Sequence, residues 1–283
     1  MHNENLKISV VIPTAGATSR RTSLLNVIDS ILQQDLKVFE IILVWQAEED
    51  IAFFSKLDAS VRVVIQEEKA LSMAKNNGVK NSVGDMVLFL DDDTTFNSCE
   101  SLSFALDVMS KNQYDFIIAN VCCESKLKPV APIDKTIQID TTTLRGNFWE
   151  PGMLISKSLF ERFKFDESLG IGCLHGASEG FDLGARLIKS GCRGVRLHDY
   201  VLNHPPLNQS NSSNVSRIFW YSMGNGIALI SNGYYKWYLL DLCKALIKLT
   251  FAVAKFDKIG VRSQAIRFLC LLLGPIVPKG RPI

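Results

Sequence analysis

The sequence of 283 residues lacks several features by which a protein is often assigned to a class. Its seven cysteines are an odd number and include no CxxC pair, which argues against a disulfide framework and a zinc knuckle. We therefore expect reduced thiols and a cytoplasmic protein. The first residues, MHNENLKISVVIPT, lack the basic start, apolar stretch and small-residue cleavage site of a secretory signal, so export by that route is not expected.

Three common motifs of nucleotide and acyl chemistry are also missing. The sequence has no GxxxxGKS/T phosphate loop and no GxSxG elbow, and its nearest approach to GxGxxG has His175 where the third glycine belongs. Neither a P-loop ATPase nor a dinucleotide-dependent oxidoreductase is supported. An anionic ligand of this chain must be held in another way.

The net charge is small, at +2, but it is unevenly distributed. Residues 234–283 carry nine Lys or Arg against two Asp, a balance of +7, so residues 1–233 carry −5. A basic tail behind an acidic body indicates an anionic partner for the tail, either lipid headgroups or nucleic acid.

Apolar runs typical of buried strands alternate with segments of helical periodicity. The expected strands are residues 8–14, 39–44, 61–65, 86–90, 152–155 and 198–204, and the expected helices are residues 24–32, 72–82 and 181–190. This alternation predicts an α/β fold with a mostly parallel central sheet flanked by helices. Residues 98–140 show little pattern, and the polar residues 208–216 predict a flexible loop. We expect a domain over residues 1–206, a connecting segment over 207–233 and an amphipathic helical tail over 234–283.

The tail pattern predicts a largely apolar helix with one narrow polar stripe. At 100° per residue, Asp241, Lys244, Lys248 and Lys255 fall within about 60° of one another, so the helix should bury most of its circumference. It could do so against the body of the protein or in the plane of a membrane surface, where the preceding Tyr and Trp side chains would also be favourable. A transmembrane span is not expected, because the apolar run 268–278 is too short.

Three consecutive carboxylates, Asp91, Asp92 and Asp93, follow the apolar residues 86–90. The carboxyl ends of strands in an α/β sheet open onto the ligand crevice, so these side chains should lie where a substrate arrives. Their mutual repulsion would be relieved by a hard divalent cation with oxygen ligands. The alternative is an acidic turn without a ligand.

The order of five segments resembles that of family-2 inverting glycosyltransferases with the GT-A fold. The segments are ISVVIPT, AKNNG, FLDDD, GNFWEPGMLISKSLF and SEGFDLGARLIKSG, which together span about residues 7–206. The resemblance implies a UDP-, GDP- or dTDP-linked sugar as donor, Mn²⁺ or Mg²⁺ as cofactor, and a hydroxyl of a glycan or lipid-linked molecule as acceptor. It implies no nucleic-acid partner. A role in cell-surface polysaccharide synthesis, at the inner face of the plasma membrane, follows as an expectation.

The resemblance also assigns roles to the acidic turn and to the helix before it. Asp93 is expected to contact the metal, Asp91 to meet the ribose or a metal-bound water, and Asp92 to shape the turn. Lys75 and Asn76 match a pair that lies under the nucleotide, where Lys75 would add positive charge near the diphosphate. Lys75 could instead be a solvated helix lysine.

Pro13 and Thr14 resemble the family's nucleotide-contacting turn. Many relatives end the second strand with two acidic residues, whereas this chain has Trp45 and Gln46. Gln46 could hydrogen-bond the edge of the base. Trp45 could stack on the base or could be a buried tryptophan of the core.

An inverting transfer needs a general base that takes the proton of the acceptor hydroxyl. The family supplies it from a Glu-Asp pair before a helix, and this chain keeps Glu179 but has Gly180 in the second position. Glu179 is therefore the first candidate and Asp182 the second, although both could merely cap the helix. His204 matches a histidine after the last core strand, and its imidazole could join Asp93 on the metal.

Two other interpretations remain open. A sugar nucleotidyltransferase could use similar carboxylates, although the only trace of a triphosphate loop is the segment from Gly16 to Arg21. A degenerate relative could bind a nucleotide sugar or act as a scaffold without turnover. The departure at Gly180 keeps that second interpretation open.

Overall fold

The computed structural model describes residues 6–122, 131–205 and 215–280. Cys123, Pro206 and residues 208–214 of the expected flexible loop lie outside these ranges. The strands are β1 (Ile8–Thr14), β2 (Glu40–Trp45), β3 (Val61–Ile65), β4 (Met86–Phe89), β5 (Thr95–Phe96), β6 (Phe116–Cys122), β7 (Ile137–Ile139), β8 (Leu154–Ser156) and β9 (Gly194–Asn203). The helices are η1 (a 3-10 turn, Thr18–Arg20), α1 (Arg21–Leu32), α2 (Ile51–Phe54), α3 (Leu71–Asn81), α4 (Ser101–Asn112), α5 (Lys157–Phe163), α6 (Glu179–Lys189), α8 (Val215–Ser231), α9 (Tyr235–Ala254) and α10 (Lys258–Leu273).

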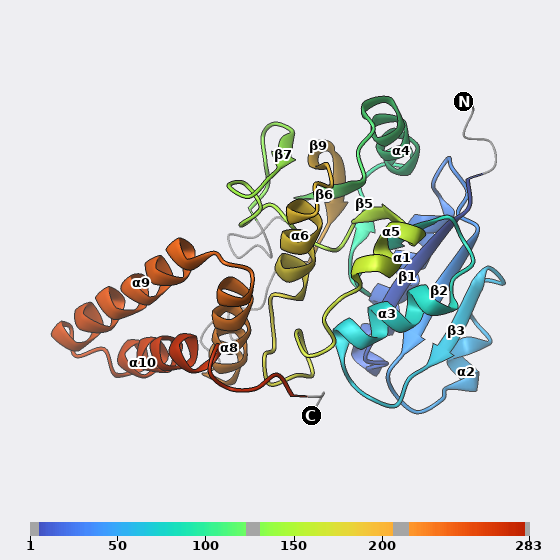
Figure 1. Ribbon diagram of the computed structural model, residues 1–283. Coiled ribbons are helices and arrows are strands. Elements are labelled where there is room, and N and C mark those ends of the chain that lie inside the picture. The colour runs from blue at the N-terminus through green and yellow to red at the C-terminus, as the bar shows by residue number, and fades with distance from the viewer. Residues whose placement is uncertain (1–5, 123–130, 206–214, 281–283) are drawn as a thin grey trace. The chain divides into compact units, whose positions relative to one another are not determined.

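The described strands form one nine-stranded sheet in the order β3-β2-β1-β4-β8-β6-β9-β5, with β7 paired to β9 (Figure 1). Strands β1, β2, β3, β4, β6 and β9 run in one direction, and β5, β7 and β8 run against them. The α/β architecture with a mostly parallel sheet is confirmed. The short strand β8, antiparallel to both of its neighbours, joins the two parallel sets.

Strand β1 lies at the centre of the N-terminal half of the sheet, and all seven of its residues are buried. It pairs with β2 up to Thr14 but with β4 only up to Val11. Pro13 is tolerated in this central strand because its missing N–H would face the side on which β4 has already ended. Helix α3 packs directly on β1 and β2, since a Cβ placed on Gly78 would lie 2.3 Å from Val11 and 3.1 Å from Val44.

Residues 98–140, which show little pattern in the sequence, contribute helix α4 and strands β6 and β7. The buried face of α4 consists of Ser101, Leu102, Ala105 and Leu106. Strand β6 contains the polar Asn120, which is 5% exposed and donates through its amide to the carbonyls of Ile133 and His198. A buried asparagine bonded in this way interrupts the apolar run by which a central strand is normally identified.

The chain divides into two compact units. Unit 1 comprises Met1–Lys69, Met73–Lys164 and Leu183–Pro206, and unit 2 comprises Ala70–Ser72, Phe165–Asp182 and Leu207–Ile283. Unit 1 contains the sheet. Unit 2 contains the loop before α6, the first turn of α6 and the helices α8, α9 and α10. Part of the segment expected only to connect the body to the tail is therefore the long helix α8.

Helix α8 packs closely on α10 because glycine occupies the contact. A Cβ on Gly226 would lie 2.6 Å from the carbonyl oxygen of Leu271, and a Cβ on Gly274 would lie 2.4 Å from that of Met223. Figure 1 shows α8, α9 and α10 as the orange to red helices of the C-terminal part. None of the helices in the described ranges is both long and apolar enough to cross a bilayer.

Candidate active site

The carboxylate of Asp92 joins the ends of two neighbouring strands of unit 1. It is 7% exposed and accepts a hydrogen bond of 2.6 Å from the hydroxyl of Thr14, at the end of β1. Arg20 of η1 donates to its other oxygen from Nη2 at 2.6 Å and from Nε at 3.1 Å. These charge-assisted bonds fix the turn that follows β4, which is the shaping role expected for Asp92.

Asp93 lies between Arg20 and His204. Arg20 Nη1 donates to Asp93 Oδ2 at 2.8 Å, and His204 Nε2 lies 3.8 Å from Asp93 Oδ1. The other ring nitrogen of His204, Nδ1, is 2.6 Å from the carbonyl oxygen of Pro205. Because a carbonyl can only accept, Nδ1 carries the proton, and in the neutral ring the lone pair of Nε2 faces Asp93. This is the tautomer that a metal-ligating histidine requires.

Asp91 belongs to a charged cluster with Lys75 and Glu150. Lys75 is only 1% exposed, and its ammonium lies 3.2 Å from Glu150 Oε1, so the interpretation of Lys75 as a solvated lysine is wrong. Burial raises the pKa of Asp91 to about 6; Lys75 lowers it, whereas the neighbouring carboxylates raise it further. Asn76, the next residue of α3, is half-buried. The positive charge of Lys75 thus acts on the acidic turn, because it lowers the pKa of Asp91.

Replacing Asp91 by asparagine is expected to stabilise the ligand-free protein at neutral pH. The pKa of Asp91 in the folded chain, about 6, exceeds its ordinary value of 3.8, so the folded state binds the extra proton and loses stability as pH rises between these values. The variant should therefore gain up to about 3 kcal/mol over the parent above pH 7 and almost nothing below pH 4.

Urea unfolding of both proteins at pH 4 and pH 8 measures this difference. Asp107→Asn is a matched control, because Asp107 is an exposed carboxylate paired with Lys111 on the surface of α4. Its effect should stay within about 0.5 kcal/mol at both pH values. An Asp91→Asn difference that is equal at pH 4 and pH 8 would contradict the raised pKa.

The donor atoms around Asp93 fit a divalent cation only as a two-ligand site. Within the described ranges, no group of three or more His, Cys, Asp or Glu side chains is arranged to hold a metal ion. Asp93 Oδ1 and His204 Nε2 nevertheless form a carboxylate and imidazole pair of the kind that suits Mn²⁺. Phosphate oxygens of a substrate and water would have to supply the other ligands, as is usual for magnesium sites on nucleotides.

A cavity of about 730 Å³ lies beside this cluster in unit 1. Its lining includes Arg21, which follows Arg20 in the chain, and Gly16, whose N–H donates to the hydroxyl of Thr14. The size is within the range of small-molecule sites. Gln46, the residue expected to hydrogen-bond the edge of the base, is among the residues that line this cavity.

Trp45 also borders the cavity but belongs to the core. It is 1% exposed, and its indole N–H donates to the carbonyl of Glu48 at 2.8 Å. Its ring packs edge-on against Phe54 with centroids 5.1 Å apart. This geometry favours the interpretation of Trp45 as a buried core residue.

Sequence reasoning missed the arginines and the acidic loop of this region. Arg20 bridges Asp92 and Asp93, and Arg21 pairs with Asp50 at 2.5 Å. Glu48 and Glu49, exposed in the loop after β2, line the cavity. They provide carboxylates a few residues after Trp45 and Gln46, the positions at which many relatives have acidic residues. The Arg20-Arg21 pair after Gly16 was the available signal for this part of the site.

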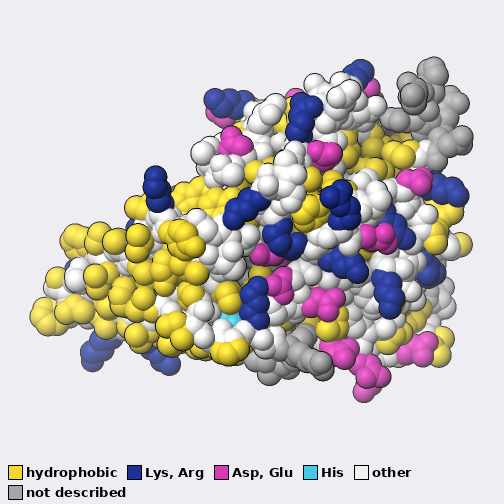
Figure 2. Space-filling view, viewed as in Figure 1, with side chains coloured by type: hydrophobic (Ala, Val, Ile, Leu, Met, Phe, Trp, Pro, Cys, Tyr) yellow, Lys and Arg dark blue, Asp and Glu magenta, His cyan; other side chains and the backbone are white. Residues whose placement is uncertain are grey.

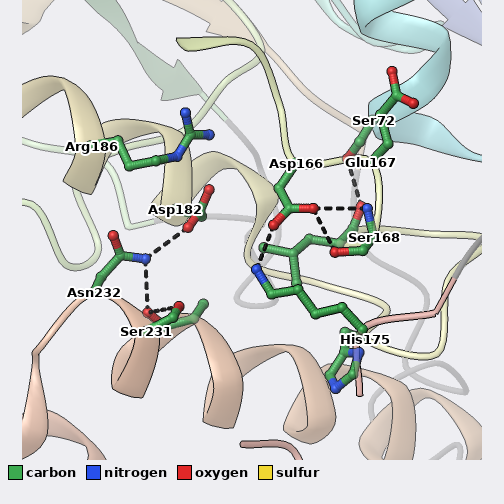
Figure 3. Close-up of polar contacts among 12 residues, drawn as sticks. Ser72, Asp166, Glu167, Ser168, His175, Asp182, Arg186, Ser231 and Asn232 are labelled. Atoms are coloured by element: carbon green, nitrogen blue, oxygen red, sulfur yellow. Dashed lines mark hydrogen bonds and ion pairs between the residues drawn. The ribbon is translucent and has the colours of Figure 1, made fainter. Parts of the chain in front are cut away.

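The two candidate bases lie in unit 2, in the first turn of α6. Both are buried, with Glu179 6% and Asp182 4% exposed. Asp182 Oδ1 accepts a hydrogen bond of 2.7 Å from the amide of Asn232, at the end of α8 (Figure 3). The carboxylate of Glu179 lies against Gly170, where a Cβ would be 3.1 Å from its Cδ. Asp182 therefore fastens α6 to α8, while Glu179 lies beside a glycine-rich loop.

His175 is a structural residue of that loop. It is fully buried, and its Nε2 lies 3.1 Å from the carbonyl oxygen of Gly274, which accepts a hydrogen bond from the ring N–H. Burial lowers the pKa of His175, so the ring is neutral at physiological pH.

Similar proteins share the name of one enzyme class. An uncharacterized glycosyltransferase of Rickettsia felis is 29% identical over 114 residues, which are 39% of this chain and 18% of that protein. The uncharacterized glycosyltransferase YwdF of Bacillus subtilis is 27% identical over 169 residues, 57% of this chain and 60% of YwdF. The chain thus spans less than two thirds of the length of each of these relatives.

The fold is similar to that of Staphylococcus aureus TarS. A crystal structure of TarS residues 1–349 in complex with UDP-GlcNAc superposes with a TM-score of 0.61 at 16% identity, covering 80% of this chain and 67% of that one. A second structure of the same TarS fragment covers 95% of this chain and 91% of that one, with a TM-score of 0.59 and 15% identity. The expected GT-A type of fold is confirmed. The family described as Glycosyl transferase family 2 matches residues 9–165, more than half of the sequence, and the chain belongs to that family.

Proposed function

We propose that this chain is a metal-dependent inverting glycosyltransferase that acts on a glycan or lipid-linked acceptor in cell-surface polysaccharide synthesis. Its donor would be a UDP-, GDP- or dTDP-linked sugar. The observation that carries the proposal is the cluster of Arg20, Asp91, Asp93, Lys75 and His204 at the strand ends of unit 1, next to a cavity large enough for a nucleoside. The TarS complexes with UDP-GlcNAc and UDP support a UDP-linked donor.

Each charged group of this cluster would have a role in binding the donor. Asp93 and His204 would hold Mn²⁺ or Mg²⁺, which stabilises negative charge on the departing nucleoside diphosphate. Arg20, with 44% of its side chain exposed, can donate charge-assisted hydrogen bonds to phosphate oxygens. Lys75 would add positive charge near the diphosphate. Asp91 would hydrogen-bond the ribose, and Gln46 would hydrogen-bond the base.

Donor binding is tested by thermal stabilisation of the full chain with a panel of UDP-, GDP- and dTDP-sugars, with and without Mn²⁺. The matching donor at 100 times its Kd should add about 2.7 kcal/mol to stability, and EDTA should remove most of that gain. Asp93→Asn should abolish the metal-dependent part, whereas Asp107→Asn on α4 should preserve it. Donor hydrolysis that is insensitive to EDTA would overturn the metal assignment.

We also propose that unit 2 attaches the protein to the inner face of the plasma membrane. In the described part of α9 only Ala245 and Ala252 are buried. The protein itself therefore does not cover most of the circumference of this helix, and of the two expected coverings the membrane surface is the one that we propose. Its outer face is apolar and exposed, and Figure 2 shows a continuous hydrophobic surface over α9 and α10. The exposed apolar residues are Tyr235, Leu239, Leu240, Leu246, Ile247, Phe251, Val253, Phe256, Ile259, Leu269, Leu272, Leu273 and Ile276.

A row of lysines borders that apolar surface. On a helical projection of α9, the exposed apolar residues spread over about 160°, and Lys244, Lys248 and Lys255 occupy the next sector of about 40°. An apolar sector edged by basic side chains is the pattern of a helix that lies in the plane of an anionic membrane surface. The polar stripe found in the sequence thus marks the border of the exposed face.

A further inference from the structure

A second cavity, of about 500 Å³, lies within unit 2 and is not used by the donor chemistry. One wall is the loop before α6, and the other is the first two turns of α8. The lining residues are Ile171, Gly172, Cys173, Gly176, Ser216, Arg217, Trp220 and Tyr221. The volume is within the range of sites for small organic ligands.

The α8 wall presents one cation among aromatic rings. Arg217, Trp220 and Tyr221 are spaced i, i+3 and i+4, so they share one face of the helix. The Arg217 guanidinium lies 4.7 Å from the centre of the Tyr221 ring, which fixes its position by a cation–π contact. Within the described ranges, no carboxylate forms an ion pair with Arg217 and none lines the cavity. The positive charge of Arg217 is thus available to a ligand.

The loop wall is held in place by close backbone contacts. The N–H of Gly176 donates to the carbonyl of Trp220 at 3.1 Å, and a Cβ on Gly176 would lie 2.7 Å from Trp220 Cβ. Gly172 has a φ of +96°, a conformation that costs glycine little. The cavity is therefore bounded by helix α8 and by a loop that is hydrogen-bonded to it.

The same loop joins the cavity to the candidate base. The carboxylate of Glu179 packs on Gly170, and the next residue, Ile171, lines the cavity. Consecutive Cα atoms are about 3.8 Å apart, so the cavity begins within one residue of the group that would activate the acceptor hydroxyl. The cavity lining and the contact of the candidate base are thus neighbours along one loop.

We propose that this cavity binds the acceptor, and that the acceptor is a lipid-linked sugar whose phosphate meets Arg217 and whose first apolar carbons lie along Ile171 and Trp220. The sugar beyond the phosphate carries the hydroxyl that loses its proton to Glu179 and gains the transferred sugar, while the nucleoside diphosphate leaves. The inference rests on the proposed transferase function and specifies its acceptor. Arginine is the residue that suits phosphate recognition, and the other large side chains of the cavity are apolar or aromatic. The exposed apolar face of α9 and α10 belongs to the same unit, so a membrane would deliver such an acceptor.

The test uses the full chain, with farnesyl phosphate as the probe below its micellar concentration, and farnesol and inorganic phosphate as partial probes. Calorimetry should show farnesyl phosphate binding at least tenfold more tightly than either partial probe. Arg217→Gln and Trp220→Ala should each weaken it at least tenfold. Arg193→Gln is the matched control, because Arg193 stacks on Tyr114 at 5.5 Å in unit 1, and it should bind as the parent does.

Equal binding of farnesol and farnesyl phosphate, or unchanged binding by Arg217→Gln, would overturn the inference. The inference would also be overturned if inorganic phosphate were the only one of the three probes that bound. Metal-dependent donor binding, measured on the same variants, separates the two proposals. If the donor binds and farnesyl phosphate does not, the acceptor assignment fails and the transferase proposal stands; if the donor does not bind, the transferase proposal itself fails.

Discussion

Replacing Glu179 by glutamine is expected to lower the turnover of sugar transfer by about a thousandfold, because a general base typically contributes a factor of 10² to 10⁴. Glutamine keeps the size of the side chain but cannot take the proton of the acceptor hydroxyl. Donor binding should be unchanged, since the groups proposed to hold the donor belong to unit 1. Transfer to an acceptor and thermal stabilisation by the donor, measured side by side, separate the two effects.

Asp182→Asn is the matched control for this experiment. Both carboxylates lie in the first turn of α6 and are buried to a similar degree, so a general effect of removing charge near the helix N-terminus should be common to both variants. Asp182 already accepts a hydrogen bond from the side-chain amide of Asn232, as expected for a residue that connects α6 to α8. We expect turnover to fall less than tenfold in this variant. A large loss in Asp182→Asn together with normal turnover in Glu179→Gln would assign the base to Asp182.

The backbone just before Glu179 is consistent with a functional role for this turn. Ser178 has a φ of +73°, which is uncommon for a residue other than glycine. Its hydroxyl donates to Asn225 of α8 at 2.5 Å, which helps to hold the conformation. Strained backbone that neighbouring contacts maintain is frequent beside catalytic groups. The residue before Glu179 is thus fixed to α8.

Local sequence patterns were sufficient for the strands of the parallel core. The apolar run 8–14 coincides with β1, and the run 61–65 coincides with β3. Strand β1 is buried at all seven positions, which favours a nearly continuous apolar run. Strand β3 is an edge strand that is only partly buried, and its signal is its β-branched valines and isoleucine rather than complete burial. The short strands β5 and β7, of two and three residues, carry no comparable signal because their pairing partner β9 determines them.

The candidate site was predictable in its carboxylates but not in the partners of those carboxylates. A strand followed by Asp91, Asp92 and Asp93 is visible in the sequence, whereas Arg20 lies about seventy residues earlier and reaches Asp92 only through the fold. The same holds for Lys75 and Glu150, which are 75 residues apart. Long-range ion pairs depend on how the strands are ordered in the sheet, and one sequence contains no record of that order.

The tail shows why periodicity alone can mislead. A narrow polar stripe predicts that the remaining surface of a helix is covered, but it does not identify the covering. In α9 the side that faces α10 includes Tyr238, whose hydroxyl donates to the carbonyl of Leu271 at 3.2 Å. The opposite apolar side remains exposed in the structure. A membrane surface is the proposed covering, and it can be tested directly.

Replacing Leu240, Ile247 and Phe251 by serine is expected to weaken binding to anionic vesicles by at least a hundredfold. These side chains are 51%, 54% and 63% exposed on α9, so their removal should leave the helix bundle intact. Burying each in a bilayer contributes about 1.5–3 kcal/mol when complete, and a hundredfold loss corresponds to about 2.7 kcal/mol. Vesicle flotation with and without phosphatidylserine measures the change. Ile51→Ser with Val83→Ser is a matched control, because these residues are 72% and 62% exposed in unit 1.

Charge reversal of Lys244, Lys248 and Lys255 separates the electrostatic part of this attachment from the apolar part. Each lysine near an anionic surface contributes about 1 kcal/mol, so glutamates at the three positions should abolish the preference for phosphatidylserine and make binding insensitive to salt. Substitutions are a sharper test than deletion of residues 234–283, because α10 packs closely on α8 and its loss would disrupt unit 2. If the serine variant binds vesicles as well as the parent does, the membrane proposal fails. If the parent instead forms a dimer that the serine variant cannot form, and neither binds vesicles, the apolar face of α9 is an interface between two copies of the chain.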